Sequence, residues 1–203
     1  MLLESGLSRL RSKIDKHACG VITAFRGTKT KKENMDNNKK LKTALERAGF
    51  TVTPVDGSYL EKQEIDGAVD MKEISEKSFF VANEKVEGDD DGKLEGILRE
   101  LGQKYDQDSI LSIPFSDDKE GRLVWTSKKR DKWWDDDQAV DGEPEVLSAG
   151  KLKMGKADGI YYSKIKGRKF EFVPTTKETI EDEEPIAESF FNLLNDINNI
   201  VNR

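Results

Sequence analysis

Four amide and guanidinium side chains stand at or close to segments where the chain is expected to turn, and they are the residues best suited to bind a polar ligand. Arg26 follows a short apolar run, Asn34 and Asn38 stand four residues apart, and Gln107 precedes another apolar run. Residues four apart on a helix share a face, so the two asparagines would point the same way. Arginine and amide groups donate directional hydrogen bonds, and a helix N-terminus adds positive potential. Together these residue types suit an anion or another polar ligand.

The order of apolar runs and capped helices predicts the elements that position these side chains. Thr30 and Glu33 fit a capping box, and Gly49 and Gly102 are typical helix ends. Strands are expected at four apolar runs, which are Val21–Phe25, Phe50–Val55, Ser78–Ala82 and Ser109–Phe115. The resulting order, β-α-β-β-α-β, is that of a ferredoxin-like split βαβ sandwich, an α+β fold.

Three connections of such a sandwich meet at one edge of the sheet. They are Arg26–Glu33, the long polar segment Asp56–Lys77 that we interpret as a connection, and Gly102–Asp108. The candidate ligand-binding residues on or next to this edge are Arg26, Asn34, Asn38, Ser58, Tyr59, Gln103 and Gln107. A plainer interpretation remains open, in which the asparagines cap and solvate a helix while Gln107 and Asp108 close a turn.

The remaining segments divide the chain into four expected parts. An N-terminal amphipathic helix covers residues 1–18 and the α/β sandwich core covers 19–116. A charged, irregular excursion covers 117–158, and a β-hairpin with a C-terminal amphipathic helix packed on the core covers 159–203. Candidate partner-binding residues lie in the last two parts, because they are large and apolar: Trp133, Trp134, Phe190, Leu193 and Ile197.

Composition excludes several kinds of site. The formal net charge is −6, yet seven basic residues fall between Arg26 and Lys42, so overall acidity disfavours a nucleic-acid coat without excluding a local anion site. A single cysteine and a single histidine exclude an intrachain disulfide, a Cys/His zinc site and a Ser-His-Asp triad. The acidic clusters lack calcium-loop spacing. We therefore expect no metal, no cofactor and no catalytic residue that the sequence alone can name. The apolar runs are too short for a membrane span, so a soluble protein is expected.

Five short motifs give the chain a resemblance to a family. They are Thr23-Ala24-Phe25-Arg26, Asn34 to Asn38, Pro54-Val55-Asp56-Gly57, Ser78-Phe79-Phe80-Val81 and Gly102-Gln103. In these, residues 20–115 resemble an uncharacterised α/β family common in tailed-phage genomes, with bacterial relatives. The resemblance implies no activity. It implies a place in the host cytoplasm or within a phage particle.

The sequence favours a non-enzymatic, phage-type accessory or virion-associated protein over an enzyme. Its partners would be other proteins, either virion components or further copies of the chain, with nucleic acid and membrane disfavoured. Two alternatives remain. One is a small enzyme or sensor that binds a nucleotide-like anion at the Arg26 edge, and the other is a modulator of a host factor that handles nucleic acid.

Overall fold

The computed structural model describes residues 6–65, 68–127, 146–155, 161–165 and 168–175. Its three described helices are α1 (Gly6–Ile14), α2 (Lys31–Arg47) and α3 (Lys93–Lys104). Its described strands are β1 (Cys19–Thr23), β2 (Thr51–Ile65), β3 (Ala68–Ala82), β4 (Ser109–Ile113), β5 (Glu120–Trp125), β6 (Val146–Gly155), β7 (Tyr161–Ile165) and β8 (Arg168–Thr175). The chain is therefore a mixed α/β protein.

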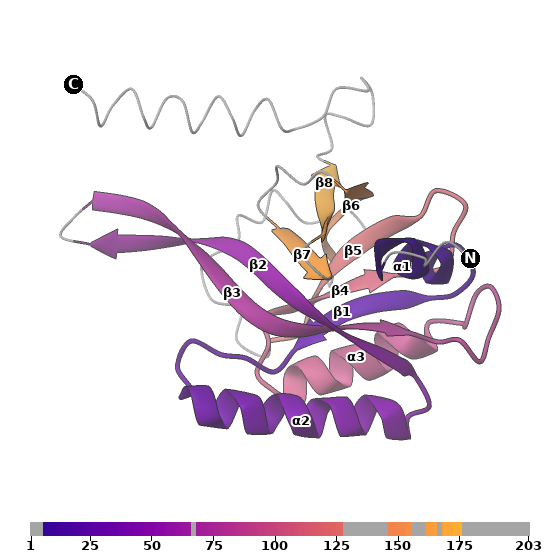
Figure 1. Ribbon diagram of the computed structural model, residues 1–203, viewed down its shortest axis with the longest axis horizontal. Helices are drawn as coiled ribbons and strands as arrows, with labels where there is room; N and C mark the ends of the chain where they lie inside the picture. Colours follow the sequence, from indigo (N-terminus) through magenta and orange to yellow (C-terminus); the bar gives the residue numbers. More distant parts are fainter. Residues whose placement is uncertain (1–5, 66–67, 128–145, 156–160, 166–167, 176–203) are drawn as a thin grey trace.

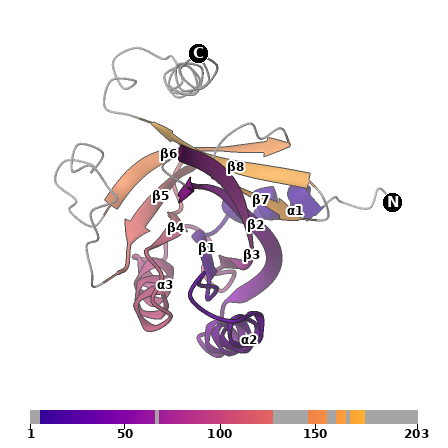
Figure 2. The same cartoon turned by 90° about the vertical axis from the view of Figure 1, so that its left-hand side faces the viewer.

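The strands form one antiparallel sheet that curls until it closes. The order around the sheet is β1-β3-β2-β7-β8-β6-β5-β4, and β4 pairs with β1 to complete the ring. Figure 2 shows the ring almost end-on, with β6 and β8 opposite β1. Every described strand thus has two neighbours, so the ladder leaves none of them as a sheet edge.

Two helices cover the outer face of this barrel along β1 and its neighbours. The capping box at Thr30 starts α2, because the Thr30 hydroxyl accepts from the Glu33 N–H while the Glu33 carboxylate accepts from the Thr30 N–H. Leu41, Leu45 and Leu98 then face the sheet, and none of them is exposed. Both helices lie on the same side of β1 (Figure 1).

The third helix, α1, lies on the opposite side of the same strands (Figure 1). Its buried Leu7, Leu10 and Ile14 pack with Cys19 and Phe80 of the sheet's inner face. The inner face is therefore apolar where α1 covers it. None of the described helices is both long and apolar enough to cross a membrane.

The four predicted strands do lie in one sheet, as neighbours in the order β4-β1-β3-β2. The first of them begins at Cys19 and ends at Thr23, two residues earlier than expected. The ferredoxin-like sandwich itself is not confirmed, because the sheet continues from this group through β5 to β8 and closes on itself. The β-hairpin predicted within residues 159–203 is present as β7 and β8.

Two expectations about connections are wrong. The segment Asp56–Lys77 is mostly strand, because β2 and β3 stay paired as far as Ile65 and Ala68 and project from the body as one long hairpin (Figure 1). Cross-strand hydrogen bonds satisfy its backbone, so it needs no apolar pattern to be a strand. Within the segment expected to be irregular, residues 120–125 and 146–155 form β5 and β6. The predicted Trp133, Trp134, Phe190, Leu193 and Ile197 lie outside the described residues.

Candidate functional site

The segment that leaves β1, residues 24–26, is held by side-chain amides from two other elements. Asn38 accepts from the Ala24 N–H with Oδ1 at 2.9 Å and donates with Nδ2 to the Lys77 carbonyl at 2.7 Å. Asn38 is only 5% exposed, so both bonds are shielded from water. It therefore ties the end of β1 to β3 from its place on α2.

Asn34, one turn earlier on α2, binds the next residue of the same segment. Its Oδ1 accepts from the Arg26 N–H at 2.9 Å, and its Nδ2 donates to the Arg26 carbonyl at 3.0 Å. One amide thus satisfies both backbone polar groups of Arg26. The Asn34 side chain supplies the hydrogen bonds that a neighbouring strand would otherwise make with the Arg26 backbone. The segment 24–26 is therefore held in one conformation although it is not part of a strand.

Gln107 completes this amide clamp from the loop between α3 and β4. Its Nε2 donates to the Phe25 carbonyl at 3.1 Å, and the side chain is buried at 5% exposure. The loop is itself fixed, because the Gln107 N–H donates to the Gly102 carbonyl and Thr126 Oγ1 donates to the Gln107 carbonyl. The amide clamp (Asn34, Asn38 and Gln107) therefore joins α2, β1 and the α3–β4 loop.

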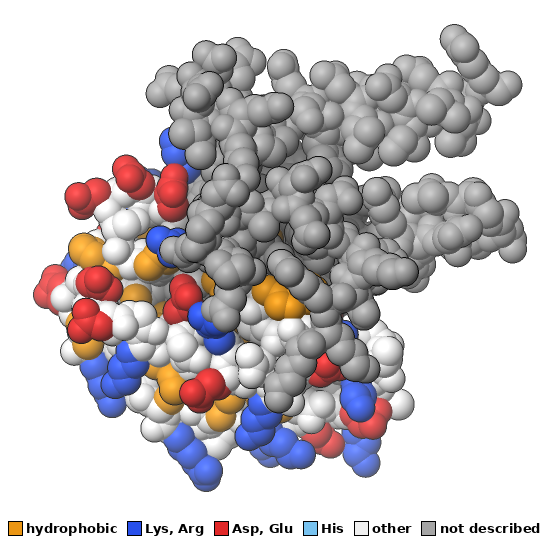
Figure 3. All heavy atoms as spheres, turned by 180° about the vertical axis from the view of Figure 1, so that it is seen from behind, with side chains coloured by type: hydrophobic (Ala, Val, Ile, Leu, Met, Phe, Trp, Pro, Cys, Tyr) orange, Lys and Arg blue, Asp and Glu red, His pale blue; other side chains and the backbone are white. Residues whose placement is uncertain are grey.

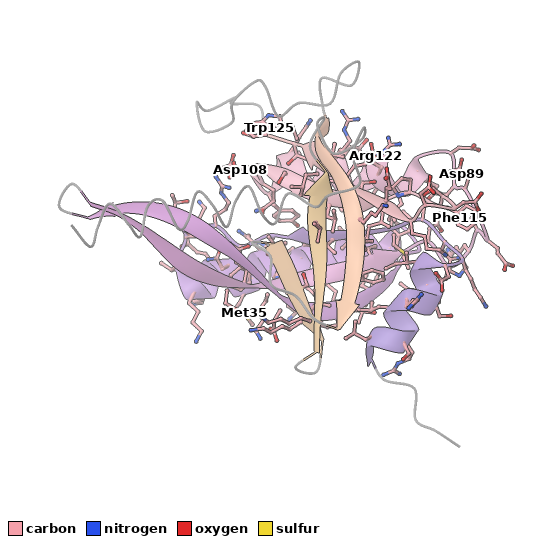
Figure 4. All side chains as sticks on the ribbon, turned by 90° about the horizontal axis from the view of Figure 1, so that it is seen from above. Met35, Asp89, Asp108, Phe115, Arg122 and Trp125 are labelled. Atoms are coloured by element: carbon pink, nitrogen blue, oxygen red, sulfur yellow. The ribbon has the colours of Figure 1, made fainter. Side chains whose placement is uncertain are left out.

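The Arg26 side chain faces two carboxylates at this junction. Its Nη1 lies 2.8 Å from Asp108 Oδ2 and its Nε lies 3.9 Å from Asp106 Oδ2. The guanidinium side chain is 26% exposed, whereas Asp106 and Asp108 are largely exposed at 80% and 58%. The charged groups are open to solvent and carry one positive and two negative charges. Asp108 lies beside Trp125, away from Asp89 and Phe115 (Figure 4).

The lysines of α2 lie on other faces of that helix than the one that forms the clamp. Lys39 and Lys40 of α2 are exposed, whereas Asn34 and Asn38 of the clamp lie on the buried face of the same helix. Figure 3 shows basic side chains along the lower edge of the molecule. Tyr105, next to Asp106, is half-buried, and this burial raises its pKa above the ordinary value. The basic run seen in the sequence therefore divides between the lysines of α2, the exposed Lys29 of the preceding loop, and Arg26.

The structure brings together four of the seven predicted ligand-binding residues, Arg26, Asn34, Asn38 and Gln107. The three amide side chains hydrogen-bond to backbone groups. Arg26 is the one residue of these four whose side chain is charged and partly open to solvent. Gln103 is exposed on α3 and is not one of the clamp residues, and the side chains of Ser58 and Tyr59 lie outside the described part of the chain. Sequence reasoning missed Asp106, although two aspartates flanking Gln107 directly after a helix were the available signal.

Cys19 and His17 make contacts typical of structural residues. Cys19 is 1% exposed, its Sγ donates to the His17 carbonyl at 3.4 Å, and burial raises the pKa of the thiol far above its usual range. His17 Nδ1 lies 2.8 Å from the Val86 carbonyl. Among the described residues, no group of three or more His, Cys, Asp or Glu side chains could hold a metal ion.

Comparison with known protein families identifies the family of this chain. The model of the S-adenosylmethionine lyase family matches residues 20–170, which is most of the chain and includes the amide clamp. The chain belongs to this family. Membership of the lyase family replaces the resemblance to an uncharacterised phage family and overturns the expectation of a non-enzymatic virion protein. The small-enzyme alternative agrees with it better. No curated protein matches the chain.

Proposed function

We propose that the protein is an enzyme that cleaves S-adenosylmethionine, and that Arg26, Asp106 and Asp108 bind the amino-acid end of this substrate. The observation that carries the proposal is the match to the S-adenosylmethionine lyase family over residues 20–170. The matched segment contains both the Arg26 segment and the α3–β4 loop, whose side chains meet at 2.8 Å. The charged junction is therefore inside the part of the chain that is shared with the family.

The charges of the junction complement those of the substrate. S-adenosylmethionine carries a sulfonium, an ammonium and a carboxylate, and so has a net charge opposite to that of one arginine with two aspartates. Arg26 would bind the substrate carboxylate, since a guanidinium donates two parallel hydrogen bonds to such a group. The amide clamp holds the backbone of Arg26 in one conformation, so little freedom is lost when the substrate binds.

The two aspartates would bind the ammonium group rather than the sulfonium. As the carbon–sulfur bond breaks, sulfur becomes a neutral thioether and loses its positive charge. A carboxylate beside sulfur would stabilise the ground state more than the transition state and would slow the reaction. Asp106 and Asp108 next to the ammonium avoid this penalty, because the ammonium keeps its charge throughout.

A lyase breaks a bond without water, so the electron pair that replaces the bond to sulfur must come from the substrate. The substrate carboxylate can attack its own side chain and close a five-membered lactone. Alternatively, a base can take a proton from the carbon next to the one bonded to sulfur, and the C–H electron pair then forms an alkene. In both cases 5′-methylthioadenosine departs with the electron pair of the broken bond. By fixing the carboxylate, Arg26 would decide whether that oxygen can reach the carbon bonded to sulfur.

The test is to incubate the purified protein with S-adenosylmethionine in ¹⁸O-labelled water and to follow products by mass spectrometry. We expect 5′-methylthioadenosine and an unlabelled four-carbon fragment. The lactone and the alkene are isomers of equal mass, so proton NMR distinguishes them by the vinyl signals that only the alkene has. Arg26→Met should raise KM about tenfold or more, in line with the loss of a charge-assisted hydrogen bond. Arg47→Met is the matched control, because Arg47 is exposed in the last turn of α2.

Three results would contradict the proposal in different ways. Absence of 5′-methylthioadenosine with the wild-type protein would exclude this activity. Label from water in the initial four-carbon product would mean hydrolysis instead of a lyase reaction. Equal kinetics of the Arg26→Met and Arg47→Met variants would place the substrate elsewhere on the molecule.

The proposal extends to the fold. We propose that α2, α3 and the strand group β4-β1-β3-β2 are a split βαβ unit of ferredoxin-like type, to which β5 to β8 have been added. The antiparallel pairing of β1 with both β3 and β4 supports this interpretation. So does the position of α2 and α3 on one face.

A further inference from the structure

The inner face of the barrel is apolar at one end of its strands and carries hydroxyl groups at the other. Under α1 it consists of apolar residues such as Cys19, Phe80 and Ile113. Ser78 lies two residues before Phe80 on β3, so it occupies the same face further along the strand. Thr23 is its direct cross-strand partner on β1. The inner face is therefore lined with hydroxyl groups at the end where β1 leads into the Arg26 segment.

Two serine hydroxyls on this inner face are buried without partners. Ser78 is 6% exposed and Ser163 of β7 is 8% exposed. Neither hydroxyl makes a hydrogen bond with any residue that the structure describes. Leaving a buried hydroxyl unpaired costs about 1–3 kcal/mol. Two such groups on one face indicate that their partner is a molecule other than the described protein.

Gly57 leaves space between these two serines. A Cβ at Gly57 would stand 2.7 Å from Ser78 Oγ, too close for any side chain without displacing the serine. Ser163 of β7 and Glu76 of β3 are the direct cross-strand partners of Gly57, so both share its face. A single glycine therefore has two hydroxyl groups and a carboxylate around it.

The chemistry of this hydroxyl patch, defined as Gly57, Glu76, Ser78 and Ser163, favours a neutral polyol over an anion. The nearby basic residues Lys77 and Lys164 are both paired in register with Asp56, next to Gly57 on β2, and so lie on the other face. A phosphate or carboxylate would find no cation on the inner face among the described residues of the patch. A vicinal diol can donate to a carboxylate and exchange hydrogen bonds with serine hydroxyls.

We propose that the hydroxyl patch binds the ribose diol of the substrate's adenosine moiety. This inference rests on the proposed function for the identity of the ligand, since S-adenosylmethionine carries one ribose. The patch adjoins Thr23, and three residues later Arg26 reaches the carboxylates assigned to the amino-acid end. One end of the barrel would then hold both ends of the substrate, the nucleoside inside and the amino acid at the rim.

The experiment measures binding of adenosine and of 2′,3′-dideoxyadenosine to the full chain by isothermal titration calorimetry, without any need for turnover. We expect adenosine to bind at least about tenfold more tightly than the dideoxy analogue, the scale of one lost hydrogen bond to a charged or buried partner. Ser78→Ala should weaken adenosine binding and reduce that preference. Gly57→Ala should weaken binding of both nucleosides, because its methyl group displaces Ser78 Oγ.

Ser75→Ala is the matched control, since Ser75 is exposed and lies on the other face of β3. A second readout separates binding from structure. Removing an unpaired buried hydroxyl should leave the free energy of unfolding unchanged or raise it, whereas it weakens adenosine binding. Urea unfolding of the Ser78→Ala variant therefore guards against loss of binding through loss of folding.

The outcomes separate this inference from the proposed function. Equal affinity for the two nucleosides, no adenosine binding, or Ser78→Ala binding as tightly as Ser75→Ala would each overturn the ribose site. The lyase activity could still be present in all three cases. Diol-dependent and Ser78-dependent adenosine binding without cleavage of S-adenosylmethionine would support the ribose site and reject the lyase proposal.

Discussion

Replacing Asn38 with alanine tests whether the amide clamp holds the Arg26 segment. The change removes the acceptor of the Ala24 N–H and the donor to the Lys77 carbonyl, both at a side chain that is 5% exposed. An unpaired buried polar group costs about 1–3 kcal/mol, so two of them cost about 2–6 kcal/mol. Alanine regains up to about 0.7 kcal/mol of helix propensity. We therefore expect Asn38→Ala to lower the free energy of unfolding by about 1–5 kcal/mol.

The neighbouring Asn37 provides the control for this substitution. It lies on the same helix, is half-buried, and makes no hydrogen bond with a described residue. Asn37→Ala gains the same helix propensity, so the difference between the two variants isolates the clamp. Urea unfolding followed by circular dichroism gives both free energies, and equal m-values would show that the unfolded states are comparable.

Hydrogen exchange adds a local readout. The Ala24 amide should exchange faster in Asn38→Ala than in Asn37→Ala, because its acceptor is gone. Free energies of the two variants within 0.5 kcal/mol of each other, together with unchanged exchange at Ala24, would refute the reasoning. The clamp would then be a set of contacts that water replaces at no cost.

Two further outcomes follow from single contacts. Gly102→Ala should lower the melting temperature, because its Cβ would stand 2.9 Å from the Thr126 side chain, whereas Gly96→Ala in the same helix meets nothing within 4 Å and should raise stability by up to about 1 kcal/mol. The pKa of Glu84 lies below its usual value, chiefly because Lys13 Nζ donates to it at 2.5 Å. Its stabilising contribution is therefore present above the unfolded pKa of about 4.3 and is lost as the pH falls toward the lower folded value. Thermal unfolding between pH 7 and pH 3 should show this loss in the wild type and a smaller one in Lys13→Met. A steeper loss in the variant, or a melting temperature of Gly102→Ala above that of Gly96→Ala, would contradict these expectations.

The helices and the central strands were predictable because their signals are local. The capping box at Thr30 and the glycine at position 49 act within one or two helical turns, and the structure contains both predicted helices. The predicted end at Gly102 is wrong, because α3 continues through this glycine to Lys104. The long β2–β3 hairpin was missed because its outer half carries no apolar alternation. Closure of the ring could not be predicted, since it requires Asp56 to pair with Lys164 far along the chain.

The candidate site was predictable in its position and not in its contacts. The predicted topology placed Arg26, Asn34, Asn38 and Gln107 at or next to one edge of the sheet, and the structure brings these four residues together. Which amides face backbone groups depends on the exact end of β1, which lies two residues earlier than the sequence indicates. Ser78 was visible as one small polar residue in an apolar strand, yet only the strand register shows which face it occupies.

The pairing of β2 with β7 has a consequence for how the molecule is made in the cell. Chains are synthesised from the N-terminus, and domains begin to fold as they emerge. The edge of β2 that pairs with β7 has no partner until Lys164 has been synthesised. The edge of β5 that pairs with β6 is likewise unpaired until β6 has been synthesised. Unpaired strands of this kind are where chains pair with the wrong partner. A nascent chain or a fragment that stops before β7 should therefore aggregate through the long β2–β3 hairpin, while the finished ring is protected.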